Sequence, residues 1–134
     1  MTAFFDANIL VYAQQNGRKA ECARALLASG GMLSVQVLNE FTAVSLRKLG
    51  KDWREIADAI DDALVLVGPP LALTLDLHVA ARALAETYQL SFYDALIAAA
   101  AIDAGCDTLY SEDMQHGQAI GALRIQNPFI ESPP

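Results

Sequence analysis

The stretch AFFDANILVY, residues 3–12, joins a short apolar segment to a helical pattern through a single aspartate. Ala3–Phe5 predicts a buried strand, Asp6 follows it directly, and the helical pattern starts at Ala7. Further extended segments alternate with helical patterns along the chain, at residues 32–33, 71–73, 108–110 and 123–126. This alternation is typical of an α/β domain with a parallel sheet, in which we expect the last of these segments to be an edge strand.

Capping residues and glycines mark where the predicted helices begin and end. Asp52 and Glu55 have the spacing of a capping box, and Gly68-Pro69-Pro70 ends the helix that they open. The same signals predict further helices near residues 19–28, 35–50, 75–88 and 92–105. We expect the terminal Pro133 and Pro134 to be frayed.

The composition is that of an ordinary folded domain. The 134 residues are 54% apolar and 19% charged, which allows a substantial core and predicts a single domain over residues 1–134. The longest apolar stretch, residues 95–102, is far shorter than the roughly 18 residues of a membrane-spanning helix. Cys22 and Cys106 are isolated and indicate neither a zinc site nor a disulfide framework. We therefore expect a soluble, cytoplasmic protein with no membrane partner.

The positions of the acidic residues are more informative than their number. Sixteen acids against nine bases give a formal charge of −7, which argues against a simple electrostatic nucleic-acid binder. Asp6 and Asp113 follow predicted strands, Asp94 opens the most apolar helix, and Glu40 lies inside an otherwise apolar helix. Acids that follow parallel strands face a common crevice at the carboxyl edge of the sheet.

Spacing alone leaves two interpretations of these four acids open. Carboxylates gathered in one crevice repel each other, and a hard cation such as Mg²⁺ or Mn²⁺ relieves that repulsion and suits phosphate substrates. Alternatively, the three aspartates act as helix caps or as first-turn acids that the helix dipole favours. In this second interpretation Glu40 pairs with Arg47, two turns along the same helix face.

Four motifs around these acids resemble the PIN-domain family, and in particular the ribonuclease toxins of VapBC-type toxin–antitoxin pairs. The matching motifs are FFDANILVY at 4–12, NEF at 39–41, LSFYDALI at 90–97 and LYSEDMQHG at 109–117. Each motif is weak by itself, but the four occur in order at family-like intervals over nearly the whole chain. The resemblance implies a PIN-like three-layer α/β/α fold with a mainly parallel sheet of about five strands.

The same resemblance implies an acidic active site. The catalytic acids of the family correspond to four positions in this sequence: Asp6, Glu40, Asp94 and Asp113. The three aspartates among them would bind Mg²⁺ or Mn²⁺. Asn8 and Ser111 match positions that line and support the pocket, and Glu112 is a further acid beside it. The implied activity is hydrolysis of RNA phosphodiester bonds by a metal-activated water, with a cognate antitoxin as partner and a homodimer as the usual assembly.

Basic residues near the end of the helix that contains Glu40 are candidates for RNA contact. Arg47, Lys48 and Lys51 lie close together and could bind backbone phosphates. They would equally form a solvated helix end, where the positive charge complements the helix dipole.

Other classes of function are compatible with the same fold. A catalytically silent PIN-like module that only binds or scaffolds stays open, although all four acids are present. A phosphotransfer domain is disfavoured, because it needs a lysine after a later strand and no lysine follows Lys51.

Overall fold

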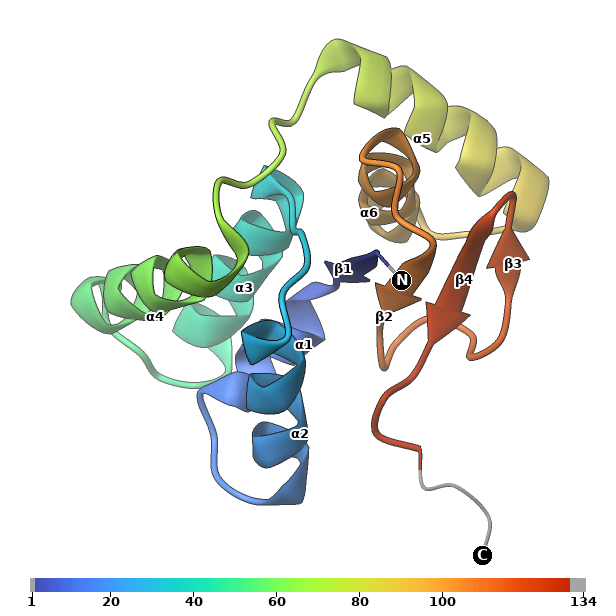
Figure 1. Ribbon diagram of the computed structural model, residues 1–134. Helices are drawn as coiled ribbons and strands as arrows, with labels where there is room; N and C mark the ends of the chain where they lie inside the picture. The colour runs from blue at the N-terminus through green and yellow to red at the C-terminus, as the bar shows by residue number, and fades with distance from the viewer. Residues whose placement is uncertain (1, 131–134) are drawn as a thin grey trace, which may run out of the picture.

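The computed structural model describes residues 2–130, in which helices surround one short sheet (Figure 1). The elements follow in the order β1 (Ala3–Phe5), α1 (Ala7–Ala13), α2 (Arg18–Ala28), α3 (Val35–Arg47), α4 (Trp53–Val67), α5 (Leu75–Tyr88), α6 (Phe92–Asp103), β2 (Thr108–Tyr110), β3 (Ala119–Ile120) and β4 (Leu123–Gln126). Figure 1 shows α1 to α4 grouped on one side of β1 and α5 and α6 on the other, as expected of an α/β/α fold. Pro133 and Pro134, which we expected to be frayed, lie outside the described residues.

The sheet is mainly parallel, with the strand order β1-β2-β4-β3. Phe4 of β1 lies opposite Leu109 of β2, and Leu109 in turn lies opposite Ile125 of β4, both pairings being parallel. The remaining strand, β3, pairs antiparallel with β4, with Ile120 opposite Leu123. The α/β class and the mainly parallel sheet predicted from the sequence are confirmed.

Two expectations about the sheet need correction. Within residues 2–130 the sheet has four strands rather than about five. Two of the five expected segments contribute only isolated parallel bridges, from Met32 to Phe4 and from Leu71 to Ser34, while β3 is a strand that the sequence did not indicate. The segment that we expected to be an edge strand, β4, is instead covered by β3. A turn at Gly121, where φ is +60°, folds β3 back along β4. Glycine adopts this left-handed conformation without a Cβ clash, which permits so tight a turn.

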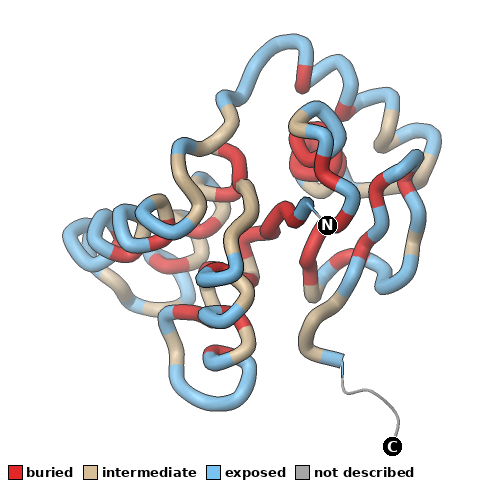
Figure 2. Tube along the Cα trace, viewed as in Figure 1, coloured by how far each residue is buried: buried red, intermediate tan, exposed pale blue. Residues whose placement is uncertain are grey.

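The central helix α6 positions the side chains at its own N-terminus. Every residue from Ala95 to Ala101 is buried, and α6 packs against α5, α3, β2 and β4. Figure 2 shows most of this helix, together with β1 and β2, in the colour of buried residues. Most residues of this run are alanines, so neighbouring elements approach the helix axis closely. This packing fixes the axis of α6, and with it the place of Asp94 in the first turn.

Short polar side chains cap the helices as the sequence predicts. Five helices begin with a side chain that accepts a hydrogen bond from a first-turn N–H, namely Asp6, Ser34, Asp52, Thr74 and Ser91. Asp52 and Glu55 form the complete reciprocal capping box. None of the helices in residues 2–130 has the length and apolar character that crossing a lipid bilayer requires.

Candidate active site

The acids singled out by the sequence come from four different parts of the fold. Asp6 follows β1 and Asp113 follows β2, and because these strands are parallel neighbours, their carboxyl ends meet at one edge of the sheet. Glu40 lies in the middle of α3, and Asp94 lies in the first turn of α6. Side chains that are distant in the sequence therefore approach the same edge.

Asp6 is the most deeply buried of these acids, with 3% of its surface exposed. Its Oδ1 accepts the N–H of Ala7 at 2.7 Å, and its Oδ2 accepts the hydroxyl of Ser111 at 2.6 Å. Burial, together with the charges of Asp94 and Asp113, raises the pKa of Asp6 to about 6 in spite of these hydrogen bonds. The charged form of this carboxylate therefore lacks a compensating positive charge.

Asn8 links the two aspartates that follow strands. Its Nδ2 donates to Oδ2 of Asp6 and to Oδ2 of Asp113, at 3.3 Å in each case. Its Oδ1 accepts the backbone N–H of Glu112 at 3.2 Å. Asn8 thus orients both carboxylates, while the hydroxyl of Ser111 donates to the same oxygen of Asp6, Oδ2.

A hollow of about 420 Å³ contains three of the four acids, Asp6, Glu40 and Asp113. Asp94 is not among the residues that line this hollow, but its charge raises the pKa of both Asp6 and Glu40. The pKa of Asp94 is itself raised, first by burial and then by the charge of Asp113. The four carboxylates therefore influence one another electrostatically, and we call the hollow with these four residues the acid site.

Glu40 is held by a neighbour on its own helix. Its Oε2 accepts a hydrogen bond from Nε2 of Gln36, one turn earlier, at 3.2 Å. Within residues 2–130 no ion pair joins Glu40 to Arg47, so this part of the structural alternative does not apply, whereas Asp6 does cap α1 through the N–H of Ala7. Burial, with a further contribution from the charges of the three aspartates, raises the pKa of Glu40 to about 7. Glu40 therefore exchanges a proton near neutral pH.

Glu112 forms contacts that the sequence did not indicate. Its carboxylate accepts the hydroxyl of Tyr12 at 2.6 Å and the ammonium of Lys19 at 2.6 Å. Burial raises the pKa of Glu112, but these two hydrogen bonds and the charge of Lys19 outweigh it and hold the pKa below its ordinary value. Neither partner carries a local signal, because they lie 100 and 93 residues away in the sequence.

The donor atoms suit a hard divalent cation that keeps part of its water shell. The residues lining the hollow supply carboxylate oxygens and include no histidine or cysteine. Among residues 2–130, no three acidic, histidine or cysteine side chains stand close enough together to enclose an ion. Mg²⁺ commonly takes only one or two protein carboxylates and completes its shell with water. Asp6 and Asp113, oriented by a shared amide, fit that requirement.

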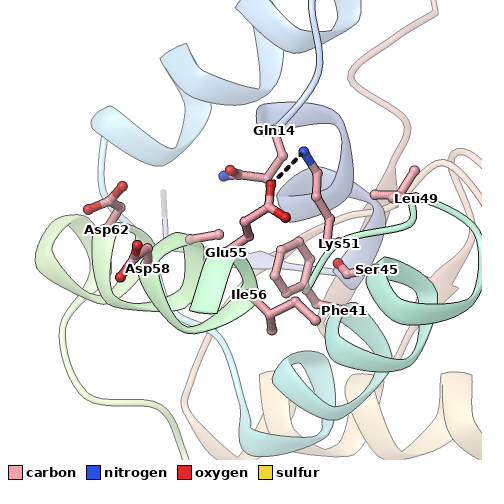
Figure 3. A pocket seen from close by; sticks show the side chains of 10 residues that line it. Gln14, Phe41, Ser45, Leu49, Lys51, Glu55, Ile56, Asp58 and Asp62 are labelled. Atoms are coloured by element: carbon pink, nitrogen blue, oxygen red, sulfur yellow. Dashed lines mark ion pairs between the residues drawn. The ribbon is translucent and has the colours of Figure 1, made fainter. Parts of the chain in front are cut away.

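The three basic residues expected near RNA occupy different surroundings. Lys48, the residue after α3, lines the hollow of the acid site. Lys51 pairs with Glu55 at 3.8 Å and lines a second cavity, of about 250 Å³, between α3 and α4 (Figure 3). Arg47 is exposed in the last turn of α3. Of these residues, Lys48 is the one that the fold brings to the acids.

Comparison with known proteins identifies the family. The PIN domain family model matches residues 3–119, and the chain therefore belongs to the PIN domain family. No curated protein sequence matches the chain significantly.

Three solved structures have a similar fold. VapBC2 from Rickettsia felis, bound to a DNA fragment from its promoter, is 23% identical, with a TM-score of 0.68 over 95% of this chain and 98% of that chain. VapC20 from Mycobacterium tuberculosis, a sarcin–ricin loop cleaving toxin, is 23% identical, with a TM-score of 0.66 over 84% and 90%. A toxin–antitoxin complex from Klebsiella pneumoniae is 21% identical, with a TM-score of 0.70 over 96% and 98%. At these identities the likeness concerns the fold.

Proposed function

We propose that this PIN domain is a metal-dependent endoribonuclease and the toxin of a toxin–antitoxin pair. The observation that carries the proposal is the bridge from Asp6 through Asn8 to Asp113, in a hollow that Glu40 also lines. The fold neighbours support it, since one is described as a sarcin–ricin loop cleaving toxin and another as a toxin–antitoxin complex. An RNA substrate implies that the protein acts in the cytoplasm.

Mg²⁺ or Mn²⁺ is the cofactor in this proposal, held by Asp6 and Asp113 with Asp94 beside them. When bound, the ion would activate water and stabilise negative charge on the scissile phosphate. Asn8 keeps the first two carboxylates oriented, so they need little rearrangement when their ligand arrives. The raised pKa of Asp6 means that a cation would replace a proton there, which makes binding weaker at low pH.

Glu40 is the residue that we assign to proton transfer. Its pKa of about 7 lets it accept or release a proton at neutral pH, where a general base is most effective. Gln36 holds one of its oxygens, which limits the rotation of the carboxylate. Glu40 would orient the attacking water and take its proton.

Lys48 is the first residue that we expect to contact the RNA backbone. It lines the hollow in which the scissile phosphate would lie, so its ammonium can bind a phosphate next to the reacting one. Arg47 and Lys51, nearby in the sequence, would extend this contact along the strand. Positive charge at this rim would offset the repulsion between the acids and the RNA backbone.

A cognate antitoxin is the protein partner in this proposal. Its candidate binding site is the cavity shown in Figure 3. Phe41 and Ile56 line the cavity, and Glu55, Asp58 and Asp62 supply carboxylates along α4. Apolar side chains beside acidic ones suit an amphipathic segment that carries basic residues. The proposal also includes a homodimer, which light scattering on the purified protein would test.

The test is RNA cleavage by the purified protein with Mg²⁺ and with EDTA. We expect cleavage only with the metal, and none by Asp6→Asn or Asp113→Asn. Asp61→Asn, which neutralises an exposed acid on α4, is the matched control and should cleave at the wild-type rate. Wild-type rates for the Asp6 variant, or cleavage in EDTA, would contradict the proposal. RNA binding by wild-type protein without cleavage would favour the catalytically silent module.

A further inference from the structure

A cluster of four side chains adjoins the four acids, and we call it the Glu112 cluster: Tyr12, Lys19, Glu112 and Phe129. Tyr12 and Glu112 also line the hollow of the acid site. Oε1 of Glu112 accepts the Tyr12 hydroxyl at 2.6 Å, and Oε2 accepts Nζ of Lys19 at 2.6 Å. Nζ of Lys19 lies 4.9 Å from the centre of the Tyr12 ring and 5.6 Å from that of Phe129. The two rings pack edge to face, with centroids 4.9 Å apart. The cluster therefore joins α1, α2, the segment after β2 and the segment after β4.

Glu112 uses both carboxylate oxygens inside this cluster. Each oxygen accepts a short hydrogen bond, one of them from a charged ammonium, so the carboxylate is already stabilised where it lies. Each oxygen keeps a second lone pair, but a cation bound there would be repelled by the ammonium of Lys19, which lies 2.6 Å from Oε2. Although it is the neighbour of Asp113 in the sequence, its side chain is committed to holding elements together.

The backbone of Glu112 connects the cluster to the acid site. Its N–H donates to Oδ1 of Asn8, which leaves Nδ2 of the same amide directed at the carboxylates of Asp6 and Asp113. Rotation of the Asn8 amide by half a turn would place its NH₂ against this N–H and its oxygen against two carboxylates, and all three hydrogen bonds would be lost. The position of the Glu112 backbone, in the segment after β2, thus helps to orient the side-chain amide of Asn8 with its NH₂ group toward Asp6 and Asp113.

We propose that Lys19 and Glu112 are positioning residues for the nuclease reaction. Their ion pair holds the segment after β2 where the Asn8 amide can bridge Asp6 and Asp113. The side chains of the pair are 50% and 26% exposed, and such pairs add little to folding stability. Loss of the pair should therefore alter the acid site more than the fold. The catalytic consequence rests on the proposed function, whereas the effect on Asn8 does not.

The first experiment measures kinetics with a saturating concentration of Mg²⁺. Lys19→Met should lower kcat about 10- to 100-fold, the range expected when catalytic groups are displaced by about 1 Å, with KM for RNA within twofold of wild type. Lys19→Arg, which keeps the charge, should restore kcat to within about threefold. Arg82→Met removes one exposed charge from α5 and should cleave like wild type. A raised KM with unchanged kcat would mean that Lys19 contacts RNA, and would overturn the proposal.

The second experiment observes Asn8 directly and needs no cleavage. The sequence has four asparagines, Asn8, Asn16, Asn39 and Asn127. In an NMR spectrum of protein labelled with ¹⁵N at asparagine, the side-chain amide signal of Asn8 is identified as the one that disappears in Asn8→Asp. Lys19→Met and Glu112→Gln should shift this signal and accelerate its hydrogen exchange, whereas Arg82→Met should not.

The two experiments separate the two proposals. An Asn8 signal that stays unchanged in folded Lys19→Met and Glu112→Gln would overturn the positioning role even if the protein is a nuclease. If wild-type protein does not cleave RNA, the proposed function fails, while a shifted Asn8 signal would still support the link between the cluster and the acid site. If Lys19→Met does not fold, Glu112→Gln alone decides the outcome.

Discussion

The buried carboxylate of Asp6 should make the metal-free protein less stable as the pH rises. The informative perturbation is Asp6→Asn, which keeps the shape of the side chain and removes its charge. The asparagine oxygen can still accept the N–H of Ala7, but Asn8 loses its acceptor at this position. These changes in hydrogen bonding do not depend on pH, so they add a constant difference. The pH-dependent part reports the charge.

The magnitude follows from the pKa of Asp6, which rises from an ordinary 3.8 to about 6. Because the folded state holds this proton more tightly than the unfolded state, the proton stabilises the fold fully below about pH 4, and the stabilisation is lost as the pH passes 6. The whole effect is about 3 kcal/mol, of which about 2 kcal/mol falls between pH 4.5 and 8. The charge of Asp6 also raises the pKa of Glu40, so removing it makes ionisation of Glu40 less costly, which acts in the same direction.

Urea unfolding in EDTA, followed by circular dichroism at pH 4.5, 6 and 8, measures this difference. The free energy of unfolding of Asp6→Asn minus that of wild type should increase by about 2 kcal/mol from pH 4.5 to pH 8. Asp61→Asn should show a constant difference over the same range, since it changes an exposed acid. A constant difference for Asp6→Asn too would refute the idea that this carboxylate carries an uncompensated burial cost.

Three further results are expected. Ser111→Ala removes the hydroxyl that donates to Asp6 at 2.6 Å. In urea titrations at pH 8, where Asp6 is charged, the free energy of unfolding should fall by about 1–3 kcal/mol. The loss should be smaller at pH 4.5, where Asp6 is protonated. Gly31→Ala would place a Cβ 2.5 Å from the buried ring of Phe5 and 2.9 Å from the carbonyl oxygen of Ala3. This overlap should lower the free energy of unfolding by about 1–3 kcal/mol, which a lower Tm would reveal. An unchanged Tm would show that the neighbouring atoms move aside without cost. Titration with Mn²⁺ should show tighter binding at pH 8 than at pH 5.5, because Asp6 must release its proton to bind the ion. Equal affinity at both values would contradict the raised pKa of Asp6.

Signals between residues close in the sequence were sufficient for the helices. Asp52 and Glu55 form the capping box that their spacing predicts, and Ser34 and Thr74 cap the helices they precede. Such hydrogen bonds join residues three positions apart, so their geometry hardly depends on the rest of the fold. The four acids could be recognised as unusual because the residues that flank them in the sequence place them at strand ends or in apolar helices.

Contacts that depend on tertiary packing were beyond the reach of these signals. The partner of Glu40 illustrates the limit, because both Gln36 and Arg47 lie on its helix and only the packed structure shows the bond to Gln36. The hairpin of β3 and β4 makes β4 an inner strand. It could not be predicted, because β3 has only two residues, too few to show the alternation of apolar and polar side chains that marks a strand.

The sequence by itself determined the α/β class, through the alternation of extended and helical segments, and most helix starts, through capping residues a few positions from their partners; it also singled out the four acids as candidates. The tertiary structure decided that Asn8 bridges Asp6 and Asp113 and that Lys19 holds Glu112. These contacts require β1 and β2 to pair in one particular parallel register, and that register results from the packing of the whole core.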